Sequence, residues 1–466
     1  MKTRIGFWIA LSSLSFCASA IASGTFSRAT MARLAALPSG HSLVITGFPA
    51  GPSHTATISF ERVEIYAPGA RLYVIGAAGK QEVPRSNLIL LRGYSDDDSV
   101  RVALALTSDG SFDSGSGEGP DGSFVLGAAI TASGAIGVGA KPQESATPAG
   151  TKLGFTCGNE FDNLDVRGLN KLTMRSTNAA LAASHALRIA TVAVDTDTAF
   201  MSSLFSNNTT NATNWIAKMF NAMNTMYERD LLVNLRQGDT TFRTVPASDP
   251  YASGGAFPVT TFPANGTDLN NFGSNWAANK TGVSRTFATL LSGKGQCSSC
   301  GTGCTSCSAS GIAWVGSYCQ TASNGGSYSL VMLYPNLSFD PNGATAARLD
   351  GHELGHNFGA NHTHCTDIST GNSPAATNTI DQCYNLESGS GCYAGATSCP
   401  ASSPGAPAGT IMSYCNVNGC AGGQNVLQFH PTQINDVLLP DISSTISGQP
   451  GCLNTSDDIF YDGFEN

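Results

Sequence analysis

The sequence predicts an α+β protein in which a β-rich amino-terminal region precedes a mixed domain. Within residues 24–180, short apolar runs such as 72–75 alternate with clusters of Gly, Pro and Asp. This pattern is typical of short strands joined by turns. Further along, an apolar stretch at 185–194 predicts a strand, and Met and aromatic residues at helical spacing over 211–228 predict a helix packed in the core. A second helix is predicted over 344–358.

The second predicted helix carries the residues that point to chemistry. His352 and His356 are four residues apart, so they lie on one face of a helix, one turn apart. Gly359 can adopt a positive φ and end the helix, so that His362 turns back toward the same point. Three such ligands leave a fourth position on a catalytic zinc ion for water. Glu353 can take a proton from that water and pass it to a leaving amine.

A lone H-E-x-x-H motif can occur by chance on a helix surface, but the Gly and the third His at fixed offsets make chance far less plausible. The stretch 352–362 resembles the metzincin metalloprotease signature, most closely that of the adamalysin (reprolysin, ADAM-like) branch and its bacterial secreted relatives. The methionine turn of metzincins is matched by 409–414, with Met412 as the turn methionine. Two residues depart from the adamalysin pattern: Thr363 replaces an Asp, and Tyr414 resembles astacins and serralysins.

This resemblance covers roughly residues 185–435 and implies a metzincin-type catalytic domain. Such a domain has a twisted mixed sheet, two long helices above the cleft and an irregular, disulfide-rich lower part. The resemblance also implies one catalytic zinc ion above an apolar floor that includes Met412. Substrate is expected to pair antiparallel with an edge strand, for which 327–334 is the candidate.

Three further features near the motif have more than one interpretation. Tyr414 either donates a hydrogen bond to the developing oxyanion or is a buried tyrosine in the turn. His364 is interpreted as a bystander, because a fourth His ligand would close the open position. Calcium (Ca2+) is common in related proteases, but the sequence has no local calcium-loop motif.

The composition and the first residues bear on location and partners. Of 466 residues, only 12% are charged, the net charge is −9, and no run of Lys or Arg occurs, which argues against a nucleic-acid partner. Residues 1–23 predict a secretory signal peptide, with Lys2 and Arg4 before an apolar core. A membrane anchor or a lipoprotein anchor at Cys17 is the alternative. No later apolar run is long enough to span a membrane. We expect a secreted, extracellular protein, or a periplasmic one in transit, and a monomer.

Cys157 is the informative residue of the 24–180 region, which we interpret as a propeptide that keeps an enzyme latent. If Cys17 leaves with the signal peptide, 13 of the 14 cysteines remain, and all but Cys157 lie between Cys297 and Cys452. The odd cysteine is therefore a candidate ligand for the fourth zinc position, in the latent form only. This arrangement resembles the cysteine switch of several metzincin propeptides. The alternative is a buried free cysteine.

The cysteine cluster at 297–307 contains two C-x-x-C pairs with only three residues between them. A zinc ribbon needs a longer loop, so disulfides are favoured over a second zinc site in an oxidising compartment. Downstream of Cys157, three basic residues are candidate processing sites or ordinary surface charge. These are Arg167, Lys171 and Arg175.

The motifs divide the chain into a signal peptide (1–23), a β-rich propeptide (24–180), a metzincin metalloprotease domain (181–455) and a short acidic and aromatic tail (456–466). We expect a secreted zinc metalloendopeptidase with protein or peptide substrates. One alternative is a zinc peptidase that acts on short or cell-wall peptides. Another is a non-catalytic binding protein on a protease scaffold, which the retained Glu353 and histidines argue against.

Overall fold

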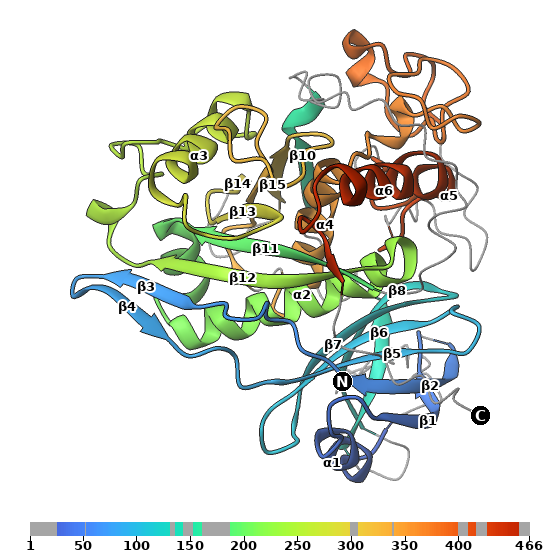
Figure 1. Ribbon diagram of the computed structural model, residues 1–466. Helices are drawn as coiled ribbons and strands as arrows, with labels where there is room; N and C mark the ends of the chain where they lie inside the picture. Colours follow the sequence, from blue (N-terminus) through green and yellow to red (C-terminus); the bar gives the residue numbers. More distant parts are fainter. Residues whose placement is uncertain are drawn as a thin grey trace, which may run out of the picture.

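The computed structural model describes residues 26–51, 53–130, 136–142, 152–160, 187–298, 306–337, 340–398, 409–415 and 426–455. The expected signal peptide, the candidate processing sites Arg167, Lys171 and Arg175, and the tail at 456–466 lie outside these residues. Within them, the chain forms two sheets with helices packed between and around them (Figure 1). The prediction of an α+β fold with a β-rich amino-terminal region is confirmed.

The smaller sheet comes from the amino-terminal region alone and is antiparallel throughout. Its strands, in spatial order, are β1 (Ser42–Pro49), β2 (Thr55–Arg62), β5 (Ile89–Tyr94), β6 (Arg101–Leu106), β7 (Phe112–Gly119), β8 (Gly122–Ile130) and β9 (Ile136–Pro142). Helix α1 (Arg28–Ala35) packs on one face through Met31 and Leu34, where Leu91 and Leu104 also lie. Because strand side chains alternate between faces, Leu90 points to the opposite face.

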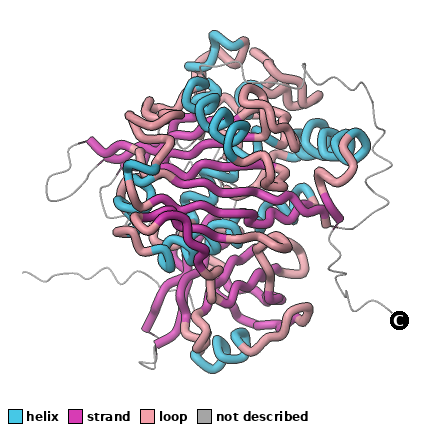
Figure 2. The backbone as a smooth tube through the Cα atoms, turned by 60° about the vertical axis from the view of Figure 1, so that its left-hand side comes forward, coloured by secondary structure: helices cyan, strands magenta, loops and turns pink. Residues whose placement is uncertain are grey.

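The larger sheet is mixed and crosses the middle of the molecule (Figure 2). Its strands, in spatial order, are β10 (Lys152–Cys157), β15 (Ser306–Ala313), β16 (Tyr328–Met332), β13 (Phe287–Ser292), β11 (Arg188–Thr196), β12 (Val233–Arg243), β3 (Leu72–Gly76) and β4 (Gly79–Val83). Two short strands join it, β14 (Gln296–Ser298) beside β15 and β17 (Asn454–Thr455) beside β11. Strand β15 runs antiparallel to β16, whereas β16, β13, β11 and β12 are mutually parallel.

Helices cover both faces of the larger sheet. Val192 and Val194 of β11 belong to the apolar cluster that contains α2 (Thr209–Leu231) and α4 (Ala344–Asn357). The intervening Ala193 belongs instead to the cluster that contains α3 (Gly266–Asn279). This alternation places α2 and α4 on one face and α3 on the other. The predicted helices at 211–228 and 344–358 and the strand at 185–194 are therefore present, within a few residues.

Helix α2 lies between the two sheets (Figure 1). The side-chain amide of Asn221 donates hydrogen bonds to the carbonyl oxygens of Leu91 and Leu104 in the smaller sheet, at 3.1 and 3.3 Å. Arg92 of the smaller sheet forms a largely buried ion pair with Glu228 of the helix. The smaller sheet is thus packed directly against helix α2.

The edges of the larger sheet differ from the expectation. Strands β3 and β4 of the amino-terminal region extend one edge, and β10 extends the other. The segment 327–334 is not an edge strand, because β16 lies between β13 and β15. All five residues of β16 are buried, which is typical of an interior strand. Among the described strands after residue 187, the outermost on this side is β15, whose small residues give a weak strand pattern.

Disulfides hold the irregular parts of the structure. The pairs in the described residues are Cys297–Cys307, Cys319–Cys452, Cys365–Cys392 and Cys383–Cys415. Cys297 and Cys307 therefore form a disulfide, as predicted for their cluster.

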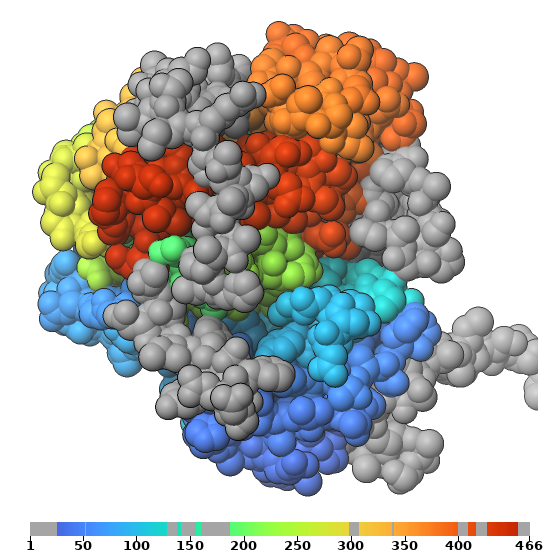
Figure 3. Space-filling view, turned by 45° about the vertical axis from the view of Figure 1, so that its right-hand side comes forward, coloured from blue at the N-terminus to red at the C-terminus, as the bar shows by residue number. Residues whose placement is uncertain are grey.

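The space-filling view in Figure 3 shows one face of the molecule. The amino-terminal region forms the lower part of this face, and residues around 360–398 form the top. Between them lie α5 (Pro431–Gln433) and α6 (Leu439–Gly448). Among the described residues, no helix combines the length and apolar character needed to cross a bilayer.

Candidate metal centre and active site

Helix α4 positions two of the predicted ligands. The buried carboxylate of Asp340 accepts hydrogen bonds from two backbone N–H groups of its first turn, at 3.1 and 2.7 Å, which caps the helix. One turn apart on its last two turns lie His352 and His356, with Glu353 beside the first. All three side chains are buried.

The chain reverses at Gly359, as the sequence predicts. Gly359 has a φ of +109°, and a Cβ atom there would lie 2.2 Å from the carboxylate of Asp441. Its N–H donates to the carbonyl of His356 at 2.8 Å, which ends the helix. The turn brings the buried His362 to within hydrogen-bonding distance of His356, with their Nε2 atoms 3.2 Å apart.

The three histidines are held in one tautomer by their Nδ1 atoms. Nδ1 of His352 and Nδ1 of His356 lie 2.8 and 2.7 Å from backbone carbonyl oxygens. Nδ1 of His362 lies 2.7 Å from the carboxylate of Glu387. Each partner can only accept, so each Nδ1 carries the hydrogen. When the ring is neutral, Nε2 then carries no hydrogen, and its lone pair faces the centre of the site.

These lone pairs fit a metal ion. The Nε2 atoms of His356 and His362 are only 3.2 Å apart, with no hydrogen left to share between them. Nε2 of His352 is buried without a hydrogen-bond partner among the described residues. Burial, and then the neighbouring His362, lowers the pKa of His352 to about 3, so the ring stays neutral. Three imidazoles with converging Nε2 atoms are the donor set of a zinc site, and the residues therefore fit that ion.

Cys157 at the end of β10 reaches the same point. Its Sγ belongs, with the three histidines, to a group of potential ligand atoms that lie within 4.8 Å of one another. Sγ is 3.5 Å from Nε2 of His356, and the side chain is fully buried. Asn159 fixes this end of the strand through two hydrogen bonds with the backbone of Ala313, at 2.8 and 3.0 Å.

Glu353 lies beside this group. One carboxylate oxygen is 3.7 Å from Sγ of Cys157, and the other is buried without a hydrogen-bond partner in the described part of the chain. Burial raises the pKa of Glu353 well above its ordinary value. The space for the carboxylate depends on Gly311 of β15, because a Cβ atom there would lie 2.1 Å from the carboxylate oxygen.

The methionine turn lies beneath the helix. A Cβ atom at Gly355 would lie 2.8 Å from Sδ of Met412, so the two elements are in close contact. Thr363, which stands where adamalysins have Asp, is bonded to this turn through its hydroxyl, 3.2 Å from the carbonyl of Met412 and 3.0 Å from the hydroxyl of Ser413. The ring of Tyr414 lies 4.7 Å from that of His362 between centroids. Its hydroxyl oxygen accepts a hydrogen bond from the Cys157 N–H at 3.1 Å.

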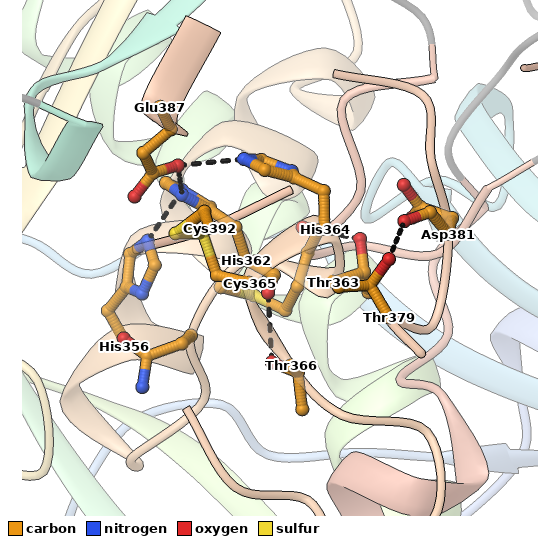
Figure 4. The surroundings of a disulfide bond; sticks show 12 residues. His356, His362, Thr363, His364, Cys365, Thr366, Thr379, Asp381, Glu387 and Cys392 are labelled. Atoms are coloured by element: carbon orange, nitrogen blue, oxygen red, sulfur yellow. Dashed lines mark hydrogen bonds and ion pairs between the residues drawn. A yellow bond between two sulfur atoms is a disulfide. The ribbon is translucent and has the colours of Figure 1, made fainter. Parts of the chain in front are cut away.

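Sequence reasoning missed Glu387 and found no partner for His364. The carboxylate of Glu387 lies between His362 and His364, 2.7 and 2.8 Å from a ring nitrogen of each (Figure 4). Burial alone would raise the pKa of Glu387, but the two imidazoles lower it to about 2. No pattern singles out this glutamate, because it lies in an irregular cysteine-rich loop some 25 residues after the motif.

Three imidazoles thus converge beside a buried carboxylate on the helix and the turn that follows it. A family model described as metallo-peptidase family M12, of the reprolysin type, matches residues 186–429. The match spans more than half of the chain, so the chain belongs to this family, and the resemblance seen in 352–362 is confirmed.

No curated protein matches the chain. Among solved structures, the chain is similar to the crystal structure of metalloproteinase-II from Bacteroides fragilis, with a TM-score of 0.33 and 10% identity. That similarity covers 73% of this chain and 86% of the other.

Proposed function

We propose that this protein is a secreted zinc endopeptidase that is made as a latent precursor. Membership of family M12 supports a metallopeptidase that acts on proteins or peptides. The observation that carries the proposal is the convergence of three imidazole lone pairs beside the carboxylate of Glu353. In this proposal His352, His356 and His362 hold zinc. Zinc, when bound, would polarise the scissile carbonyl and lower the pKa of a water molecule.

The remaining chemistry belongs to side chains of the protein. Glu353 takes a proton from the attacking water and passes it to the leaving amine. Its buried position, with one carboxylate oxygen unpaired among the described residues, suits a group that must exchange protons away from bulk water. Tyr414 donates a hydrogen bond to the developing oxyanion once its hydroxyl is no longer occupied by the backbone of Cys157. Met412 supplies the apolar floor below the ligands.

Latency is proposed to come from β10 and Cys157. Strand β10 pairs with β15, the strand on which an extended substrate would be expected to add. The pairing is parallel, whereas the expected substrate is antiparallel, so the propeptide backbone runs in the opposite direction to a substrate. In this proposal the Cys157 thiolate would be a further ligand to zinc and would exclude the attacking water.

The test is casein hydrolysis by the secreted protein, before and after removal of the propeptide, with zinc counted by metal analysis. Wild type is compared with Glu353→Ala. We expect one zinc per chain in both proteins and casein hydrolysis only by the processed wild type. A wild-type protein that binds no zinc, or a processed Glu353→Ala variant as active as the wild type, would overturn the proposal.

A further inference from the structure

Glu387 takes no part in the proposed proton transfers, yet it contacts one of the proposed ligands. One of its carboxylate oxygens, Oε2, accepts hydrogen bonds from Nδ1 of His362 at 2.7 Å and from Nε2 of His364 at 2.8 Å. Figure 4 shows the carboxylate between the two rings. The rings are stacked, with 5.3 Å between centroids and 13° between planes. His362 and His364 therefore share one buried anion.

The loop that carries Glu387 is fastened on both sides. It forms a short turn, η7 (Leu386–Ser390), between two disulfide-bonded cysteines. One disulfide, Cys383–Cys415, joins the loop to the residue after Tyr414. The other, Cys365–Cys392, joins it to the residue after His364. The disulfides thus hold the carboxylate against the third ligand from a segment with little apolar core of its own.

The third ligand is supported differently from the other two. Nδ1 of His352 and Nδ1 of His356 donate to neutral carbonyl oxygens of the backbone, one of them from the turn that follows α4 itself. Nδ1 of His362 donates to a carboxylate. His362 lies after the helix has ended, so no helical geometry fixes its ring. A charged acceptor fixes the orientation and the tautomer of such a ring and makes its Nε2 a stronger donor to a metal.

We propose that Glu387 is a positioning residue that holds His362 ready for the metal, and that His364 in turn holds Glu387. The inference rests on the proposed function, because it assumes that His362 is a zinc ligand. His364 is then not a bystander but the second anchor of the carboxylate. Its Nδ1 has no hydrogen-bond partner among the described residues, which fits a ring whose one polar contact is to Glu387.

The test measures zinc retention in the full-length zinc-loaded chain. Transfer of zinc to a chromogenic chelator is followed for wild type, Glu387→Gln and His364→Phe, with the exposed carboxylate variant Glu82→Gln as control. Loss of a carboxylate that supports a ligating histidine weakens metal affinity by roughly 10- to 100-fold. We expect an effect of that size for Glu387→Gln, a smaller effect in the same direction for His364→Phe, and none for the control.

Two further readouts separate positioning from simple support of the fold. The visible absorption spectrum of the cobalt-substituted chain should change in Glu387→Gln, because the third ring reorients. The thermal unfolding midpoint of the metal-free Glu387→Gln chain should stay close to that of the metal-free wild type. Zinc retention within about twofold of wild type in both Glu387→Gln and His364→Phe would overturn the inference while leaving the proposed function intact. A wild-type chain without zinc would instead remove the proposed function on which the inference rests.

Discussion

The two edges of the larger sheet are both covered by strands of the amino-terminal region, but the two strands present different chemistry. On one edge, β10 pairs with β15 over six residues and ends at Cys157, inside the candidate metal centre. On the other, β3 pairs with β12 over four residues and continues into β4, whose residues are mostly exposed. The same backbone hydrogen bonding thus serves both edges.

Strand addition by itself therefore does not decide function. An open sheet edge is a site where another chain can pair, so covering it protects the molecule from association. The β3–β4 hairpin does this with Leu72 packed in the central cluster and charged residues on its outer strand. Strand β10 does this too, but its end also places the thiol of Cys157 beside the three histidines. The edge covered by β10 would control the reaction, and the edge covered by the β3–β4 hairpin would affect only the stability of the fold.

The largest expected effect is at Cys157. We predict that Cys157→Ala makes the full-length chain hydrolyse casein without an added protease, because loss of the thiol would leave room for water beside the three histidines. The rate of casein cleavage after secretion is the measurement. The double variant Cys157→Ala/Glu353→Ala is the control and should stay inactive and intact. A single variant that remains as latent as wild type would show that β10 alone blocks the site.

The next effect compares a glycine at each edge. In the Cys157→Ala background, Gly311→Ala should lower casein hydrolysis by roughly 100-fold, because displacement of a catalytic group by about 1 Å has that cost. The new Cβ would lie 2.1 Å from the carboxylate of Glu353. At the other edge, Gly76→Ala meets the side-chain oxygen of Thr244 at 3.2 Å and should leave hydrolysis unchanged. Equal rates in both variants would refute a role for this strand in seating Glu353.

Local spacing in the sequence predicts part of the site, but the pairing of distant segments is not predictable from it. The spacing of His352, Glu353 and His356 on one helix is local, so it predicts the centre of the site. The strand that brings Cys157 there was not predicted, because strand patterns give elements but not their partners. The choice of 327–334 as edge strand failed for that reason. Glu387 was missed because its position depends on disulfide pairing, which spacing does not reveal.

The third prediction concerns the stability of the edge formed by β3 and β4. Leu72 is 1% exposed and belongs to the central apolar cluster, so Leu72→Ala should lower the free energy of unfolding by roughly 2–5 kcal/mol. The midpoint of urea unfolding measures this. Val44→Ala, at a residue that is 55% exposed, is the control and should leave the midpoint unchanged. Latency should persist in both variants. Casein hydrolysis by uncleaved Leu72→Ala would mean that the two edges are coupled.

The smallest effect is expected on the outer surface of the hairpin. Arg71, just before β3, forms an ion pair at 2.7 Å with Glu82 of β4, and the two side chains are 60% and 51% exposed. The hydrogen bond to Glu82 raises the pKa of Arg71, but water and salt screen such exposed pairs, so Arg71→Ala should leave the urea midpoint unchanged.

The matched control lies on the neighbouring strand, where Arg243 is paired with Asp195 in the core. Arg243→Ala leaves that carboxylate buried without its cation, which costs roughly 3–5 kcal/mol. A large loss of stability in Arg71→Ala would show that the hairpin depends on its surface charges. A loss of stability in Arg243→Ala alone would show that buried residues stabilise this edge, as the packing of Leu72 indicates.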